Sequence, residues 1–100
     1  MKKQDQISKI LDERGSRYGD FKDHAVVTQV FKEQLAEMLK WKDKKLPADM
    51  QESLDMIFHK IGRIVNGDHF YADSWIDIAG YAKLISDRLQ LEESSNESAK

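Results

Sequence analysis

The chain has 100 residues, a formal net charge of −2 and no cysteine. Its length fits one small domain, and its near-neutral charge argues against a nucleic-acid binder that depends on a strong basic field. The lack of cysteine excludes disulfides, thiolate catalysis and cysteine-ligated zinc.

The first half of the chain predicts two helices. Its charged N-terminus leads into no long apolar run, so we expect no signal peptide and no membrane span, and a cytoplasmic location. Ile7, Ile10 and Leu11 form a short apolar stripe that we expect to break at Gly15. A second helix is predicted from about residue 23 to residue 42, where apolar residues recur at helical spacing.

The second half predicts two more helices and a tail. The third helix follows Pro47 and should end at Asn66, because the Asn-Gly pair that begins there is a strong termination signal. The fourth, from about residue 73 to residue 91, is apolar on more than one side, as in a helix buried by several neighbours. We therefore predict an all-α fold, a compact bundle of about four helices over residues 1–91. Residues 92–100 have nothing to bury and should form a disordered tail.

Asp73 and Asp77 form an acidic pair at i, i+4 on the fourth helix. Two carboxylates one turn apart repel unless a cation or a basic side chain lies between them, and Mg²⁺ is commonly held by one or two carboxylates together with substrate phosphates. The simpler alternative is that Asp73 caps the helix and that Asp77 complements the helix dipole. Both readings stay open.

Lys60 and Arg63 form a basic pair near the end of the third helix. The simplest role for both residues is to complement the helix dipole. Alternatively, they would bind a phosphate, or Arg63 would form a salt bridge with Asp77. Gly62 and Gly80 are costly inside helices, which predicts a close crossing of the third and fourth helices or space for a ligand.

Two aromatic residues are candidates for contact with a base. Tyr81 would stack on a base or pack as a half-buried tyrosine. Tyr18 lies in the segment 12–21 with Arg14, two glycines and a second arginine, and we expect this segment to be a loop that contacts phosphate or base. A turn with solvated charges is the alternative.

Three blocks resemble a known group of proteins: RGSRYGDF from Arg14, KIGRI from Lys60 and DSWIDIAGYA from Asp73. They look like blocks of small phage and prophage proteins, including the nucleotide-modification-associated domains. Those are similar to the all-α NTP pyrophosphatases, the MazG-like and dimeric dUTPase group. In that group paired acids on two helices hold magnesium, and water attacks between the α- and β-phosphates. The resemblance covers most of the chain up to about Leu89.

The resemblance implies a role for each candidate residue. Asp73 and Asp77 correspond to the second acidic pair and would hold Mg²⁺, and Asp77 and Lys60 would be the catalytic residues. The chain departs from the family at the first pair, normally E-x-x-E, because Glu33 and Glu37 are one residue further apart.

Three hypotheses follow. The first is a phage-type protein in the cytoplasm of an infected or lysogenic bacterium that binds a nucleotide, with Mg²⁺-dependent hydrolysis to a monophosphate and pyrophosphate left open. Lys60, Arg63 and Arg14 would meet phosphate, and Tyr18 or Tyr81 would meet the base. The second is a module without catalysis that sequesters a nucleotide signal or inhibits a host protein. The third is a structural helical oligomer. The small size and the apolar faces predict a homodimer or homotetramer in each case.

Overall fold

The described part of the chain contains four helices: α1 (Lys2–Tyr18), α2 (Phe21–Trp41), α3 (Ala48–Asn66) and α4 (Ala72–Ala99). The computed structural model describes residues 2–99, and side chains are described for residues 6–95. The predicted all-α bundle of four helices is confirmed, and no strand occurs in this range. None of these helices is sufficiently long and apolar, over the residues described, to span a bilayer.

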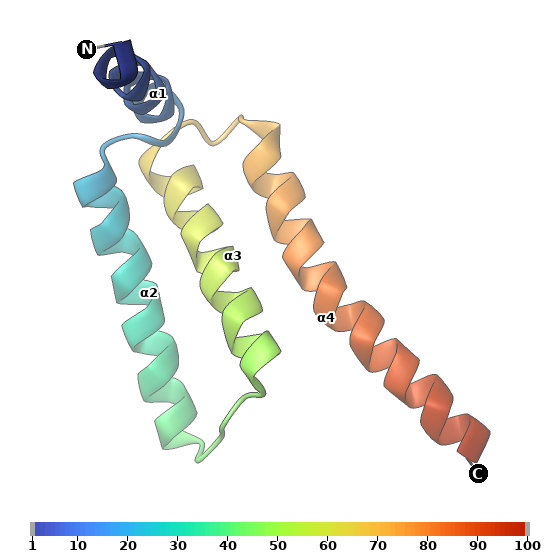
Figure 1. Ribbon diagram of the computed structural model, residues 1–100. Coiled ribbons are helices and arrows are strands. Elements are labelled where there is room, and N and C mark those ends of the chain that lie inside the picture. Colours follow the sequence, from blue (N-terminus) through green and yellow to red (C-terminus); the bar gives the residue numbers. More distant parts are fainter. Residues whose placement is uncertain (1, 100) are drawn as a thin grey trace.

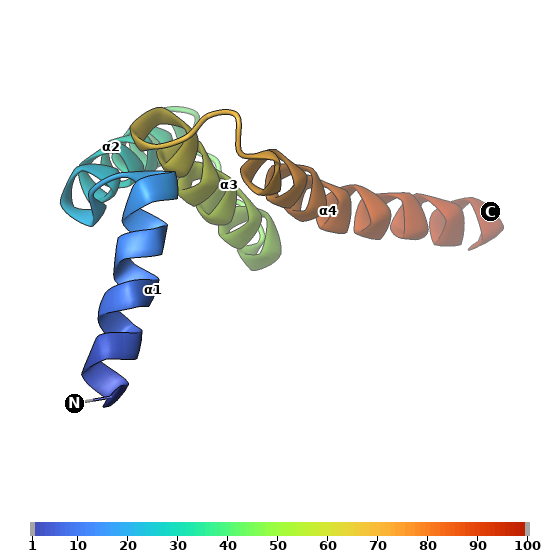
Figure 2. The ribbon, with the colours of Figure 1, turned by 90° about the horizontal axis from the view of Figure 1, so that it is seen from above.

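The central helix is α3, which packs against α2, against α4 and against the end of α1. α2 and α4 lie on either side of α3 (Figure 1), and within the described residues they do not contact each other. α1 projects from the layer formed by these three helices, and the second half of α4 extends beyond it (Figure 2). The molecule measures 63 × 31 × 28 Å along its principal axes.

Local signals place most helix boundaries close to the predicted ones. Asp20 is the N-cap of α2, and its carboxylate accepts a hydrogen bond from the Lys22 backbone N–H at 3.3 Å. α3 begins directly after Pro47 and ends at Asn66, where Gly67 is the C-cap residue. These boundaries agree with the sequence.

Two segments differ from expectation. Residues 12–18, expected as a loop, continue α1 through Gly15, because one glycine lowers helix stability by only about 1 kcal/mol and does not end the helix. α4 continues to Ala99, across most of the segment expected to be a disordered tail. Arg88 Nη1 pairs with Glu92 Oε1 at 2.8 Å one turn later, which supports the start of this extension. Residue 100 lies outside the described residues.

The close helix crossing occurs at Gly62, but its partner is α2 rather than α4. A Cβ atom at this position would lie 2.7 Å from Thr28 Oγ1 and 2.9 Å from the His24 ring. Only glycine lets the two helices approach this closely without a shift. A Cβ atom at Gly80 would meet nothing within 4 Å.

The helices do not enclose an apolar core. Within residues 6–95 the buried side chains are polar, among them His24, Thr28 and Lys60, and no apolar side chain is buried. α4, expected to be buried by several neighbours, contacts only α3 and leaves Trp75 55% and Ile76 62% exposed. The four helices of one chain therefore leave much of their apolar surface in contact with water.

Candidate ligand-binding site

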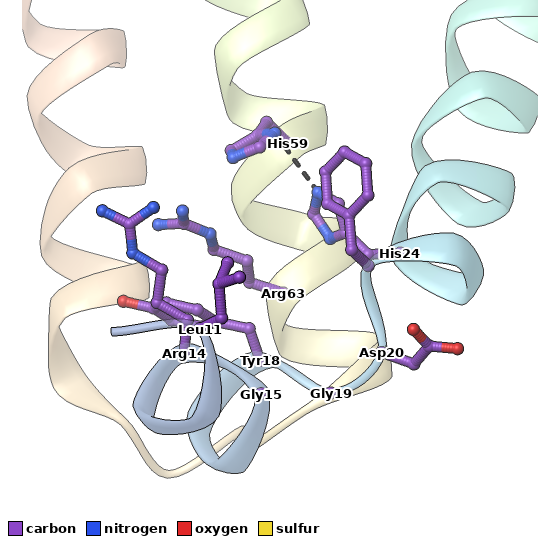
Figure 3. Close-up of a pocket in the computed structure, with 10 residues that line it drawn as sticks. Leu11, Arg14, Gly15, Tyr18, Gly19, Asp20, His24, His59 and Arg63 are labelled. Atoms are coloured by element: carbon purple, nitrogen blue, oxygen red, sulfur yellow. Dashed lines mark hydrogen bonds between the residues drawn. The ribbon is translucent and has the colours of Figure 1, made fainter. Parts of the chain in front are cut away.

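A cavity of about 620 Å³ lies between the end of α1, the start of α2 and the second half of α3 (Figure 3). Its volume is within the range of small-molecule sites, roughly 300–1,000 Å³. The lining combines cationic, imidazole, aromatic and small residues: Leu11, Arg14, Gly15, Tyr18, Gly19, Asp20, Phe21, His24, His59 and Arg63. Three of the predicted ligand-binding residues, Arg14, Tyr18 and Arg63, therefore meet in one place.

Backbone contacts hold the end of α1 over α3. The Asn66 side-chain amide at the end of α3 donates to the Tyr18 and Asp20 carbonyl oxygens at 3.2 and 2.8 Å. The Asp68 N–H donates to the Arg17 carbonyl at 2.6 Å. Gly19, with φ of 81°, supplies the left-handed turn that a side chain would disfavour. This junction fixes the last two turns of α1 beside the cavity.

Two guanidinium groups from different helices line the cavity. Arg63 of α3 stacks on the ring of Tyr18, with its Cζ atom 4.0 Å from the ring centroid. Arg14 of α1 is exposed and lies beside it (Figure 3). No ion pair is formed by either arginine with the side chains of residues 6–95. The Asp20 carboxylate also borders the cavity but points away from both guanidinium groups (Figure 3).

Two histidines, 35 residues apart in sequence, form the opposite wall. His24 Nε2 lies 3.2 Å from His59 Nδ1. The Thr28 hydroxyl donates to the His24 carbonyl at 3.0 Å, so its oxygen, 3.4 Å from His24 Nε2, can only accept there. In this contact one imidazole nitrogen donates and the other accepts, and the tautomer decides which of the two donates. His59 Nε2 is left to form a hydrogen bond with a ligand, as a donor when the proton is on this nitrogen.

Both imidazoles are uncharged at neutral pH. Burial, followed by the nearby charge of Arg63, lowers the pKa of His59 to about 4. Burial also lowers the pKa of His24, whose Nδ1 lies against the Gly62 backbone without a hydrogen-bond partner of ordinary geometry among the described residues. The fixed positive charge of the cavity therefore comes from the two arginines.

Lys60 lies away from this cavity, between α3 and α4. Its Nζ atom is 2.9 Å from Asp77 Oδ2, and its side chain is only 10% exposed. The prediction that Arg63 reaches Asp77 is wrong, because Lys60 occupies that position. The prediction that Lys60 and Arg63 face one site is also wrong.

Among the described side chains of one chain, the acidic pair of α4 is not joined by a third acidic or histidine side chain. Asp77 is neutralised by Lys60, and Asp73 lies beside Tyr71, raising the pKa of that phenol. Across the side chains described, no three histidine or acidic residues come together in a way that could hold a metal ion. This arrangement does not fit Mg²⁺ bound by Asp73 and Asp77, since the charge of Asp77 is already compensated.

Tyr81 also lies outside the cavity. It is half-buried on the side of α4 that faces α3, and its backbone carbonyl accepts a hydrogen bond from Ser53 Oγ at 2.9 Å. This placement agrees with the packing alternative and removes Tyr81 from the cavity residues.

A family model matches residues 4–89, which include the whole cavity, and its description is a domain of unknown function, DUF6378. The chain belongs to the DUF6378 family. No curated protein and no solved structure matches it.

Sequence reasoning missed the two histidines of the cavity in this DUF6378 domain, His24 and His59. The two histidines had no ligand spacing, because they meet only through the close crossing of α2 and α3 at Gly62. Phe21 follows the Asp20 N-cap and is 76% exposed at the cavity. Phe21 belongs to the segment 12–21 that the sequence predicted to contact phosphate or base.

Proposed function

We propose that this chain binds a small molecule that carries phosphate, of the nucleotide class, in the cavity between α1, α2 and α3. The observation that carries the proposal is the meeting of Arg14 and Arg63 in one cavity, with no carboxylate partner for either among the described side chains. Guanidinium groups bind phosphate oxygens through strong charge-assisted hydrogen bonds. A phosphate would supply the missing countercharge.

The other lining residues support a ligand with an aromatic part. Phe21 offers an exposed ring at the cavity, 6.2 Å from the His24 ring. Stacking of a base on an aromatic side chain contributes roughly 1–3 kcal/mol. With its proton on Nε2, His59 would donate to an oxygen of the phosphate or the sugar. Two arginines, one donor and one free aromatic ring together match a nucleotide better than a bare phosphate ion.

Binding without turnover is the form of this function that the site supports. A phosphoryl-transfer or hydrolysis site needs a group that activates water, and Mg²⁺ would be the usual source of it. The acids predicted to hold Mg²⁺ are not at the cavity, and Asp77 is already paired with Lys60. Of the three hypotheses from the sequence, a module that sequesters a nucleotide signal therefore agrees best with the cavity.

Calorimetric titration of the whole chain with ATP, ADP, AMP and pyrophosphate in EDTA tests the proposal. We expect saturable binding of nucleotide without a divalent metal. Arg14→Gln should weaken it at least tenfold, because a hydrogen bond to a charged group contributes about 1.5–3 kcal/mol.

Arg17→Gln is the matched control. Arg17 lies on the same helix, loses the same charge and is outside the cavity, where it pairs with Glu13 and covers the Tyr71 ring. The affinity of Arg17→Gln for nucleotide should stay within about twofold of the wild type, because Arg17 does not line the cavity and its charge is screened by salt. Absence of binding, or equal losses in both variants, would contradict the proposal.

A further inference from the structure

We infer that a second copy of this chain covers the apolar side of the α2–α3–α4 layer, on the face opposite the ligand cavity. The inference is independent of the proposed function. It starts from the total surface: the chain exposes 8043 Å² for a mass of 11.6 kDa. A compact monomer of this mass exposes about 5,800 Å². The excess is therefore on the order of 2,000 Å².

This excess has the size of an obligate interface. A standard protein–protein interface removes about 800 Å² per partner, and permanent dimers remove roughly 1,000–2,500 Å² per partner. The radius of gyration leads to the same conclusion, because it is 17.8 Å whereas a compact domain of 100 residues has about 13 Å. A chain in which no apolar side chain of residues 6–95 is buried needs its partner in order to fold stably.

A second copy is available wherever the chain is made, whereas a foreign partner requires a second gene product. Most soluble oligomers are homo-oligomers, usually with two-fold symmetry. The near-neutral net charge of −2 creates little repulsion between two copies. These points favour self-association over a foreign partner.

A second cavity locates the interface. It has a volume of about 300 Å³ between α3 and α4, and no charged residue lines it. Its wall is formed by Leu46, Met50, Ser53, Leu54, Ile57, Ala82 and Ile85. Leu54 and Arg63 are separated by about two and a half helical turns, so this cavity and the ligand cavity open on opposite sides of α3.

An apolar stripe on α4 borders the second cavity. Trp75, Ala79, Ala82 and Leu89 have helical spacing and share one side of α4, and Ala82 itself lines the cavity. Trp75 is 55% and Leu89 37% exposed. α1 does not contact α4 within the described residues, so nothing from its own chain covers this stripe. The second copy would bury it together with the cavity.

Ala82→Arg tests the interface, and Leu84→Arg is its control. Ala82 and Leu84 are both exposed on the same helix but lie about 200° apart around its axis. Analytical ultracentrifugation of the wild type should give the mass of two 11.6 kDa chains. Ala82→Arg should raise the dimer dissociation constant at least 100-fold, and Leu84→Arg should change it less than fivefold. A monomeric wild type, or equal effects of the two variants, would overturn the inference.

Cross-linking gives a readout that does not depend on disrupting the fold. The chain has no cysteine, so Ala82→Cys and Leu84→Cys each introduce a single thiol. A short bismaleimide should join two Ala82→Cys chains in high yield and two Leu84→Cys chains poorly. Failure of Ala82→Cys to cross-link, while Leu84→Cys cross-links, would place the partner on the other side of α4 and contradict the inference.

Discussion

Arg63 stacks on Tyr18 with its guanidinium carbon 4.0 Å from the ring centroid, and this contact joins α3 to the end of α1. The Tyr18 ring also meets Tyr71 in a T-shaped contact, with centroids 6.0 Å apart. Tyr18 thus fixes the direction of Arg63, and its ring is not free to stack on a base. Phe21 is the aromatic side chain of the cavity with an open face.

Phe21→Ala should therefore separate nucleotide binding from phosphate binding. Loss of base stacking, worth roughly 1–3 kcal/mol, should weaken the binding of ADP about tenfold or more and leave the binding of pyrophosphate nearly unchanged. Calorimetry with both ligands measures the difference. Phe70→Ala is the control, since Phe70 is 83% exposed but outside the cavity. Equal loss of ADP and pyrophosphate in Phe21→Ala would show that Phe21 supports the cavity and does not contact the base.

Asp77→Asn should lower stability without changing affinity for nucleotide. It leaves the buried Lys60 ammonium group without its partner, and because Asp77 is 45% exposed we expect a loss of roughly 1–2 kcal/mol in the free energy of unfolding. Urea denaturation measures this loss. Asp87→Asn breaks the exposed pair with Lys83 and should cost less than about 0.5 kcal/mol. A large loss of Mg²⁺-dependent nucleotide binding in Asp77→Asn would instead support the metal-site hypothesis.

Stability should fall as the pH decreases from about 6.5 to about 4. In the folded state the pKa of His59 is about 4, against 6.5 for an unperturbed histidine, so between these pH values the unfolded chain binds the additional proton. The stabilisation is complete above pH 6.5 and is lost as the pH falls towards the folded pKa. The pKa of His24 is lowered in the same direction.

Urea denaturation at a series of pH values checks this dependence. His59→Gln should flatten the fall within that window, because the side-chain amide does not titrate and can still form a hydrogen bond with His24. His69→Gln changes an exposed loop histidine and should keep the wild-type slope. An unchanged slope in His59→Gln would refute the assignment.

Gly62 and Gly80 should respond to alanine with opposite signs. Gly62→Ala places a Cβ atom 2.7 Å from Thr28 Oγ1, and we expect a loss of about 1–3 kcal/mol from overpacking of the α2–α3 crossing. Gly80→Ala meets nothing within 4 Å and should gain about 0.5–1 kcal/mol from helix propensity. Chemical denaturation at one protein concentration compares the two. Destabilisation by both would mean that Gly80 also lies in a close contact.

The helices could be predicted from local signals, whereas their contacts could not. Asp20, Pro47 and the Asn66–Gly67 pair act on their immediate neighbours, so their effect can be read from the sequence. α1 continues through Gly15 because a single glycine weakens a helix only slightly.

The candidate site was predicted in part, for a geometric reason. Lys60 and Arg63 are only about 60° apart around α3. Yet α4 and the end of α1 lie next to each other around α3, so Lys60 meets Asp77 of α4 and Arg63 meets Tyr18 of α1. Sequence spacing cannot make this distinction. The pairing of His24 with His59 likewise depends on which helix crosses at Gly62.

Nuclear magnetic resonance of the arginine side chains during an ADP titration in EDTA tests the central claim most directly. We predict saturable shifts of the Nε–Hε signals of Arg14 and Arg63, with the signals of Arg17 and Arg88 unchanged. Arg88 is the distant reference, because it lies on α4 outside the cavity and forms ion pairs with Asp49 and Glu92. No shift at Arg14 and Arg63, or shifts confined to Arg17 and Arg88, would contradict a phosphate site in this cavity.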